Sequence, residues 1–209
     1  QDGEAIDALS DPDVVARLAD LIDDVADPRQ PDRLAPGRAF SRQSVTFEPG
    51  VGYVGLVCVY PEFGTYLHPA LIASKTGAPG TWRYLGQLAG EPAEEAARRR
   101  VWSDGGSLVR LADRRWRIYL NGYGDGALAI LEADTLLGPW RFLRDENGAV
   151  RQIAPSPGPS PALFPHLLKV SDREWHLWLS DRWIPSQIWH YVSEDGLDFR
   201  PYGSQPELE

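Results

Sequence analysis

Short apolar and β-branched runs, separated by turns rich in Gly, Pro and Asp, occupy most of the chain after residue 43. The three most strongly β-prone runs lie at 53–60, 116–120 and 175–179. A further short run precedes each of them, at 44–47, 107–111 and 165–170. Runs of this length and composition, bounded by turn residues, predict antiparallel strands. The pattern therefore predicts an all-β fold for this part of the chain.

A repeat runs through these strands. An aromatic residue followed by Arg recurs at intervals of 58 and 59 residues, at Trp82, Trp140 and Phe199. Ten residues before each aromatic stands an apolar residue of an expected strand, namely Ile72, Ile130 and Trp189. Each unit reads as a four-stranded meander, the size of a propeller blade, which buries its faces against neighbouring blades. An open β-sandwich is the alternative, but its strands need no fixed period. The spacing therefore favours a small β-propeller of about three blades.

The N-terminal part of the chain has a helical pattern. Asp11 and Pro12 precede a series of apolar positions that runs at helical spacing from Val14 to Val25, and Pro28 follows. Asp suits the N-cap, Pro suits the first turn, and a later Pro ends a helix. We therefore expect an amphipathic helix that packs on the flank of the propeller.

Two other segments interrupt the repeat. The Ala-, Glu- and Arg-rich stretch 91–100 predicts a short exposed helix after the first blade, and the Pro-rich stretch 154–161 predicts a stiff linker into the third. We divide the chain into residues 1–43, the N-terminal helix with an extended lead-in, and residues 44–209, the β-propeller domain.

Composition excludes several classes of partner. The 21 basic and 30 acidic side chains give a net charge of −9, which repels phosphate backbones and anionic lipid. We therefore expect neither nucleic acid nor membrane as a partner. The single Cys58 excludes an internal disulfide and a zinc site built from several thiolates. The chain lacks Met and begins at Gln1, so we expect that a start residue or signal peptide has been removed. Composition indicates neither the compartment nor the oligomeric state.

Three parts of the chain carry a family resemblance. They read LLGPW at 136–140, PHLLKV at 165–170 followed by EWHLWLS at 174–180, and YVSEDGLDF at 191–199. Over roughly residues 44–203 this succession of buried runs and turns resembles the five-bladed propeller glycosidases of the arabinanase, xylosidase and invertase superfamily. The resemblance implies three acidic residues at the starts of inner strands in successive blades.

The chain departs from that superfamily in two ways. Three blades are readable where the superfamily has five. Asp104 corresponds to the middle acid, but the equivalent position in the third blade is Leu163, and in the first blade it is Thr46. The resemblance therefore indicates a reduced or divergent member.

The meander predicts which loops share one end of the propeller. If each inner strand starts at the rim, the second strand returns there, so the loops between second and third strands open on the same rim. With Asp104 and His166, these loops would gather Glu62, Tyr66, His68, Tyr123, Asp125, Asp181, Arg182 and Trp183. Aromatic faces stack on the C–H patches of sugars, and carboxylates and Arg bind hydroxyl groups. We therefore expect a carbohydrate or another polyoxygenated small molecule as the ligand.

Glycosidic hydrolysis needs one protonated carboxylic acid and a second carboxylate about 5 to 9.5 Å away. Glu62 is our candidate acid, because aromatic neighbours would desolvate it and raise its pKa, and Asp104 is the candidate base. Carboxylates in Gly-rich loops also commonly cap turns. His68 and His166 with Asp125 offer metal-ligating groups, but such histidines are more often structural, so we expect no metal.

Three functional hypotheses follow. The first is a carbohydrate-processing protein, glycoside hydrolase-like if it is an enzyme. The second is a catalytically silent binding propeller that lost the acid at Leu163. The third is a propeller recruited to a non-glycoside reaction such as natural-product cyclisation. No phosphate loop, dinucleotide fingerprint or Gly-x-Ser-x-Gly motif is present, so we expect no cofactor.

Overall fold

A computed structural model describes the chain in eight stretches: 40–59, 68–78, 80–93, 105–123, 127–153, 163–180, 187–204 and 206–207. The predicted N-terminal helix and the Pro-rich linker lie outside these residues. Of the helix predicted at 91–100, residues 91–93 form one helical turn, and the rest lies outside the described residues. Within the described stretches, no helix has the length and apolar character needed to cross a membrane.

Three antiparallel sheets follow one another along the chain, each a simple meander. Blade one consists of β1 (Phe40–Glu48), β2 (Gly52–Val59), β3 (His68–Ser74) and β4 (Arg83–Gln87). Blade two consists of β5 (Gly106–Arg110), β6 (Trp116–Tyr123), β7 (Ala127–Ala133), β8 (Arg141–Phe142) and β9 (Gln152–Ile153). Blade three consists of β10 (Leu163–Ser171), β11 (Glu174–Ser180), β12 (Ile188–Ser193) and β13 (Arg200–Pro201). The predicted four-stranded units are confirmed, and blade two has an additional strand, β9, which pairs with β7.

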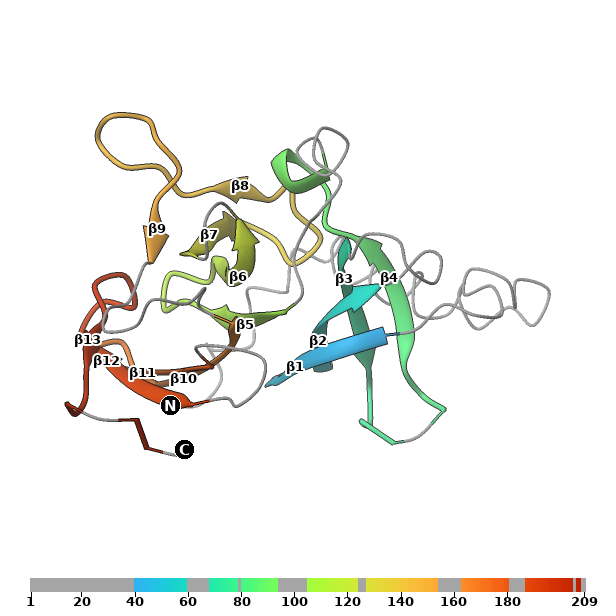
Figure 1. The fold of residues 1–209 in the computed structure, drawn as a ribbon. Coiled ribbons are helices and arrows are strands. Elements are labelled where there is room, and N and C mark those ends of the chain that lie inside the picture. Colours follow the sequence, from blue (N-terminus) through green and yellow to red (C-terminus); the bar gives the residue numbers. More distant parts are fainter. Residues whose placement is uncertain are drawn as a thin grey trace, which may run out of the picture.

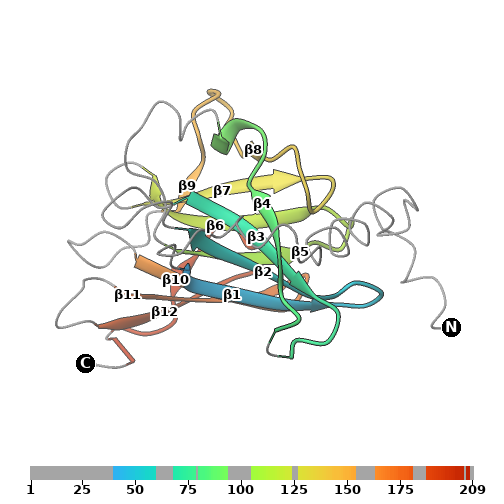
Figure 2. The same ribbon diagram turned by 90° about the vertical axis from the view of Figure 1, so that its right-hand side faces the viewer.

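The three sheets are arranged side by side around their first strands (Figures 1 and 2). Strand β5 packs against β1 on one side and against β10 on the other. A sheet that is apolar on both faces must pack against another layer on each face, and blade two does so against blade one and blade three. The chain has the all-β architecture predicted from the repeat, with inner strands β1, β5 and β10.

Two apolar clusters fill the seams between the blades. Between blades one and two, Leu56, Leu108 and Trp140 belong to one buried cluster. Between blades two and three, Tyr119 and Leu177 belong to another. Trp140, Tyr119, Leu56 and Leu177 have no solvent-exposed surface. The seams, rather than a single central core, therefore hold most of the buried apolar surface.

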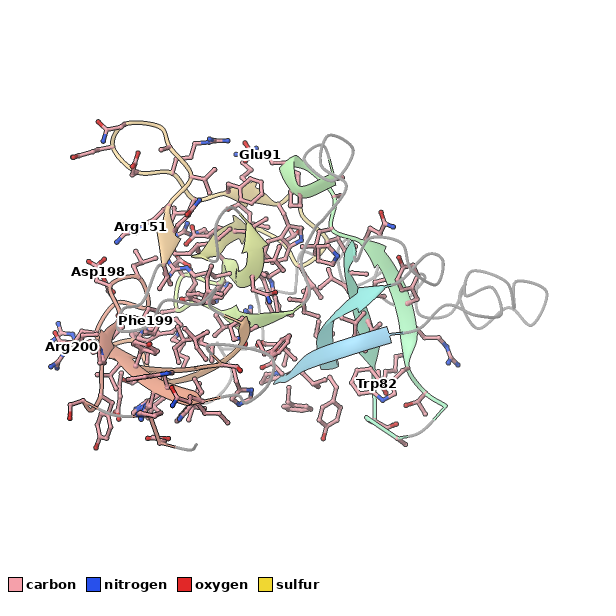
Figure 3. All side chains as sticks on the ribbon, in the orientation of Figure 1. Trp82, Glu91, Arg151, Asp198, Phe199 and Arg200 are labelled. Carbon is pink, nitrogen blue, oxygen red and sulfur yellow. The ribbon has the colours of Figure 1, made fainter. Side chains whose placement is uncertain are left out.

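The aromatic repeat marks the entry to the fourth strand in every blade. The Arg that follows Trp82, Trp140 or Phe199 pairs with the third strand, as Arg83 with Ala73, Arg141 with Glu132 and Arg200 with Val192. Figure 3 shows Trp82 and Phe199 in blades one and three, on opposite sides of the molecule. Ile72, Ile130 and Trp189 lie in the third strands β3, β7 and β12, as predicted, and they stand one, two and three residues before these paired positions. The turn into the fourth strand shortens by one residue in each successive blade.

The chain leaves blade one along the outer edge of blade two. Gly90 forms a parallel bridge with Trp140, whose N–H donates to the Ala89 carbonyl over 2.8 Å. The Glu91 carboxylate, labelled in Figure 3, accepts from the Phe142 N–H over 2.8 Å. Gly90 has φ +98°, and a Cβ there would lie 2.4 Å from the Trp140 carbonyl oxygen. Only glycine permits this approach, which anchors the connection between the two blades.

A buried ion pair also crosses the first seam. Arg110 of β5 contacts the Glu48 carboxylate of β1 over 2.9 Å, and both side chains are largely buried. Burial raises the pKa of Glu48 above its ordinary value of 4.5, and the hydrogen bond and charge of Arg110 offset this only in part. The ionised form of Glu48 is thus less favourable in the folded protein than in the unfolded chain.

Replacing Glu48 by Gln should change how stability depends on pH. A raised folded-state pKa contributes stability below pH 4.5, and this contribution is lost as the pH rises through the folded-state pKa. We expect the free energy of unfolding of the wild type, relative to Glu48→Gln, to decrease as the pH rises from 4 towards neutrality. Urea unfolding of both proteins across this pH range measures the difference in free energy of unfolding. If the wild type instead gains stability relative to Glu48→Gln as the pH rises, Arg110 stabilises the ionised Glu48 by more than burial destabilises it.

Candidate functional site

The inner strands begin, and the second strands end, at one rim of the molecule. Phe40 pairs with Val59 in blade one, Gly106 with Leu120 in blade two and Leu163 with Ser180 in blade three. The connections from second to third strands therefore leave from this rim in every blade. The short connections from first to second strands lie at the opposite end. This arrangement is the one that the meander predicts.

Most of the predicted site residues belong to those rim connections. Seven of them lie outside the described residues: Glu62, Tyr66, Asp104, Asp125, Asp181, Arg182 and Trp183. His68 and Tyr123 are described by their backbone only, as the first residue of β3 and the last of β6, which places both at the rim. Asp104 directly precedes Gly105 in the sequence, and β5 starts at the next residue, Gly106.

His166 is the one predicted site residue with a described side chain. It is exposed, and its ring centroid lies 6.2 Å from that of Trp178. It lies three residues into β10, and its neighbour Leu167 belongs to the seam with blade two. Since successive side chains of a strand point to opposite faces, His166 lies on the face of blade three that points away from blade two.

The backbone at the start of β5 is held closely by both neighbouring blades. A Cβ on Gly106 would lie 2.6 Å from the Leu56 side chain of blade one. A Cβ on Gly105 would lie 3.7 Å from Phe164 of blade three. The Gly105 carbonyl accepts from the Asn121 N–H over 3.1 Å. Gly106 therefore lets blades one and two approach closely, and Gly105 lies at ordinary contact distance from blade three.

Three buried polar side chains lie at the rim end of the blades and were not among the site residues predicted from the sequence. Ser107 is buried, and its hydroxyl donates to the Pro165 carbonyl over 2.7 Å and accepts from the Leu167 N–H over 3.1 Å. Asn121 is 1% exposed and Ser180 is 9% exposed, and each lies at the rim end of a second strand. The signal in the sequence is a polar residue directly after an apolar run, as at 116–120 and 175–179.

Phe164 has an unusual backbone conformation beside this junction. Its φ is +50°, in the left-handed region that bulky residues rarely adopt. Such a conformation persists only where the surrounding structure enforces it, and the Ser107 bonds to the next residues of β10 provide this constraint. Blade two therefore holds the backbone of β10 directly after Phe164.

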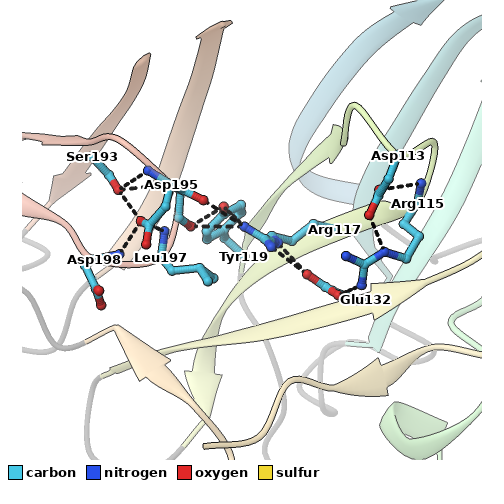
Figure 4. Close-up of polar contacts among 10 residues, drawn as sticks. Asp113, Arg115, Arg117, Tyr119, Glu132, Ser193, Asp195, Leu197 and Asp198 are labelled. Atoms are coloured by element: carbon cyan, nitrogen blue, oxygen red, sulfur yellow. Dashed lines mark hydrogen bonds and ion pairs between the residues drawn. The ribbon is translucent and has the colours of Figure 1, made fainter. Parts of the chain in front are cut away.

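A second polar network ties blades two and three together at the end opposite the rim (Figure 4). The Arg117 guanidinium binds the Glu132 carboxylate over 2.6 Å, and the Tyr119 hydroxyl donates to the Gly196 carbonyl over 2.5 Å. Burial raises the pKa of Tyr119 to about 12, so the phenol stays protonated as a donor. This network acts as a structural clamp, since its groups are fully engaged with one another.

Asp195 organises the turn that contains Gly196, whose carbonyl accepts the hydrogen bond from Tyr119. Its carboxylate accepts from the N–H groups of Leu197 and Asp198 and from the Ser193 hydroxyl. Burial alone would raise the pKa of Asp195, but these hydrogen bonds outweigh it, so the pKa lies below its ordinary value. The turns between the third and fourth strands of blades one and three share one hydrogen bond. The Ser74 hydroxyl accepts from the Gly77 N–H over 2.9 Å in blade one, and the Ser193 hydroxyl accepts from the Gly196 N–H over 3.0 Å in blade three.

A histidine pair lies on the outer face of blade three. Nδ1 of His176 and Nε2 of His190 are 2.8 Å apart, and Nδ1 of His190 is 2.8 Å from the Glu207 carboxylate. The Trp178 ring stacks on His190 at 4.5 Å, and its N–H donates to Glu207 over 3.1 Å. In the part of the chain that the structure describes, no cluster of three His, Cys, Asp or Glu side chains is arranged to hold a metal ion.

Comparison with known proteins shows the fold. No family model and no curated protein matches the sequence. Among solved structures, the chain is similar to an exo-β-1,3-galactanase from Clostridium thermocellum, with a TM-score of 0.56 and 14% identity. That similarity covers 81% of this chain and 37% of the galactanase. An α-L-arabinofuranosidase from the same organism has a TM-score of 0.49 and 14% identity, over 80% of this chain and 51% of that one.

The likeness to the galactanase supports the three-sheet arrangement as a β-propeller. At 14% identity it shows the fold and not the activity. The chain spans between a third and about half of the length of these two solved structures.

Proposed function

We propose that this chain processes carbohydrate at the rim where its inner strands begin, in the manner of a glycoside hydrolase. The observation that carries the proposal is the convergence of three blades on Gly105 and Gly106, directly after Asp104. A carboxylate next to such a junction would be held by packed backbone on both sides, which is the rigidity that catalytic groups need. The galactanase of the same fold supports the choice of a sugar.

The proposed reaction uses two carboxylic acids. Glu62 would protonate the glycosidic oxygen of the leaving sugar, and Asp104 would act on the opposite side as base or nucleophile. The remaining rim residues would hold the sugar by stacking and by hydrogen bonds to its hydroxyls, namely Tyr66, His68, Tyr123, Asp125, Asp181, Arg182 and Trp183. His166 is left out of this set because it lies on the outer face of blade three.

A silent binding propeller is the second candidate function. The observation that favours it is Leu163, an apolar residue at the rim start of β10, where the resemblance implies an acid. A site that retains its aromatic and polar loops but lacks one acid would still bind sugars without cleaving them.

One experiment separates the two candidates. The chain is titrated calorimetrically with β-1,3-galacto-oligosaccharides and arabino-oligosaccharides, and the same mixtures are then assayed for released monosaccharide. Binding with release supports the hydrolase. Binding without release over long incubation supports the silent propeller. Neither binding nor release of any oligosaccharide in the panel would contradict both.

A further inference from the structure

Two histidines on the outer face of blade three face each other across neighbouring strands. His176 of β11 is paired with Val192 of β12, and Trp178 of β11 is paired with His190, so the two histidines are diagonal neighbours on one face of the sheet. Nδ1 of His176 and Nε2 of His190 are 2.8 Å apart. Neutral imidazole nitrogens are common ligands of transition-metal ions, so this pair has the chemistry of a metal site.

The far nitrogen of each ring contacts a carboxylate. Nε2 of His176 lies 3.3 Å from the Glu174 carboxylate, and Nδ1 of His190 lies 2.8 Å from the Glu207 carboxylate. An ionised carboxylate only accepts hydrogen bonds, so both contacts favour a proton on the far nitrogen. A neutral imidazole has one proton, and the two nitrogens that face each other are then left with their lone pairs.

Two neutral imidazoles do not satisfy all three contacts. The rings carry two N–H groups between them, whereas the contacts to Glu174, to Glu207 and between the rings need three protons. Either a third proton or a metal ion bound to both facing nitrogens completes the set. Imidazoles are ordinarily neutral above pH 7, so the third proton is scarce there. A metal ion completes the same arrangement without it.

The surroundings of the two rings match those of metal-binding histidines. Such histidines commonly donate the N–H that does not face the metal to a carboxylate, which fixes the orientation of the ring and raises its basicity. His176 and His190 both have this contact. The Trp178 ring also stacks on both, at centroid distances of 5.7 Å from His176 and 4.5 Å from His190. Neither imidazole therefore rotates freely.

The spacing and exposure of the pair suit a small divalent ion. Zn²⁺ binds imidazole nitrogen at about 2.0 to 2.1 Å, so two nitrogens on a tetrahedral ion lie about 3.3 Å apart. The facing nitrogens would need to separate by about half an ångström to admit it. The side chain of His190 is 8% exposed and that of His176 is 20% exposed, so solvent reaches the pair beside His176.

We propose that His176 and His190 bind a transition-metal ion that prefers imidazole, such as Zn²⁺, Ni²⁺ or Cu²⁺, through the two facing nitrogens. Water completes the coordination, because the described residues include no cluster of three His, Cys, Asp or Glu side chains suited to a metal ion. The ion links β11 to β12. Through His190 and Glu207 it also holds the stretch 206–207 on blade three, where the Glu207 N–H donates to the Ile188 carbonyl over 2.8 Å. This site is separate from the rim loops and does not depend on the proposed activity.

Calorimetric titration of the full chain with Zn²⁺ and with Ni²⁺ tests the site. We expect the wild type to bind, and His176→Gln and His190→Gln each to lose at least about 100-fold in affinity, because each removes one of two ligands. Glu207→Gln keeps both imidazoles and should weaken binding by about tenfold or more, the usual effect of losing the carboxylate behind a metal-binding histidine. His166→Gln is the matched control. It removes an exposed imidazole beside Trp178 on the same face and should leave the affinity unchanged.

Electron paramagnetic resonance of the Cu²⁺-loaded chain gives an independent readout, because it detects the nitrogen ligands directly. We expect coupling to two nitrogens in the wild type and to one fewer in His176→Gln. Circular dichroism checks the fold of every variant, and the partly exposed His176 keeps the test decisive if His190→Gln does not fold. No binding by the wild type, unchanged affinity in His176→Gln, or an equal loss in His166→Gln would each overturn the proposal.

Discussion

Replacing Asp104 by Asn is expected to lower turnover of the cleaved oligosaccharide by about 10²- to 10⁴-fold, the usual contribution of a positioned acid or base. The substitution keeps the size of the side chain and removes its ionisable group. Because Asn has nearly the shape of Asp, and residue 104 directly precedes Gly105 and the start of β5, the amide should occupy the same place as the carboxylate. The loss should therefore appear in kcat, and the unfolding midpoint should change little.

The control for this prediction is Asp113→Asn, the same chemical change in an exposed turn at the end opposite the rim, where Asp113 bonds only to Arg115 among the contacts described. Its turnover should equal that of the wild type. Glu62→Gln should show a loss of similar size on a natural glycoside and a smaller one on a nitrophenyl glycoside, whose leaving group needs less help from an acid. Unchanged turnover in both Asp104→Asn and Glu62→Gln would remove the proposed acid and base.

Replacing Trp140 by Ala is expected to reduce the free energy of unfolding by about 3–5 kcal/mol. Trp140 is fully buried, belongs to the cluster of the first seam, and donates its indole N–H to the Leu136 carbonyl over 3.2 Å. Truncation removes this packing and leaves a cavity at the point where blade one is joined to blade two. Urea unfolding followed by far-ultraviolet circular dichroism measures the loss.

Trp140→Phe is the matched control, because it keeps an aromatic ring in the seam and removes only the second ring and the indole donor. Its loss should be clearly smaller than that of the Ala variant. Equal losses would mean that the indole hydrogen bond, and not the filling of the seam, accounts for the effect. A loss below about 1 kcal/mol in the Ala variant would contradict the placement of Trp140 in a packed seam.

The blades could be predicted from the sequence because period and turn chemistry agree. Trp140 and its counterparts mark the same step in each meander, the entry to the fourth strand. The exact register could not be predicted, since the turn before each aromatic differs in length by one residue from blade to blade. Strand β9 was also missed, because it consists of only two residues, Gln152 and Ile153, and adjoins a Pro-rich stretch.

The rim could be predicted as the end from which the connections between second and third strands leave, because strand direction alone decides this. The buried polar groups beside it could not be predicted. Ser107 and Asn121 look in the sequence like ordinary residues at strand ends, and only the convergence of separate blades buries them. The outward position of His166 depends on which of two alternating faces meets blade two, and the strand pattern alone does not determine this.

Hydrogen–deuterium exchange, measured with and without a bound oligosaccharide, tests most directly whether the ligand site lies at the rim. We predict that the sugar slows exchange at the start of β5 and at the ends of β6 and β11. Slower exchange confined to the turns at 49–51, 112–115 and 172–173, at the other end of the same strands, would contradict the account.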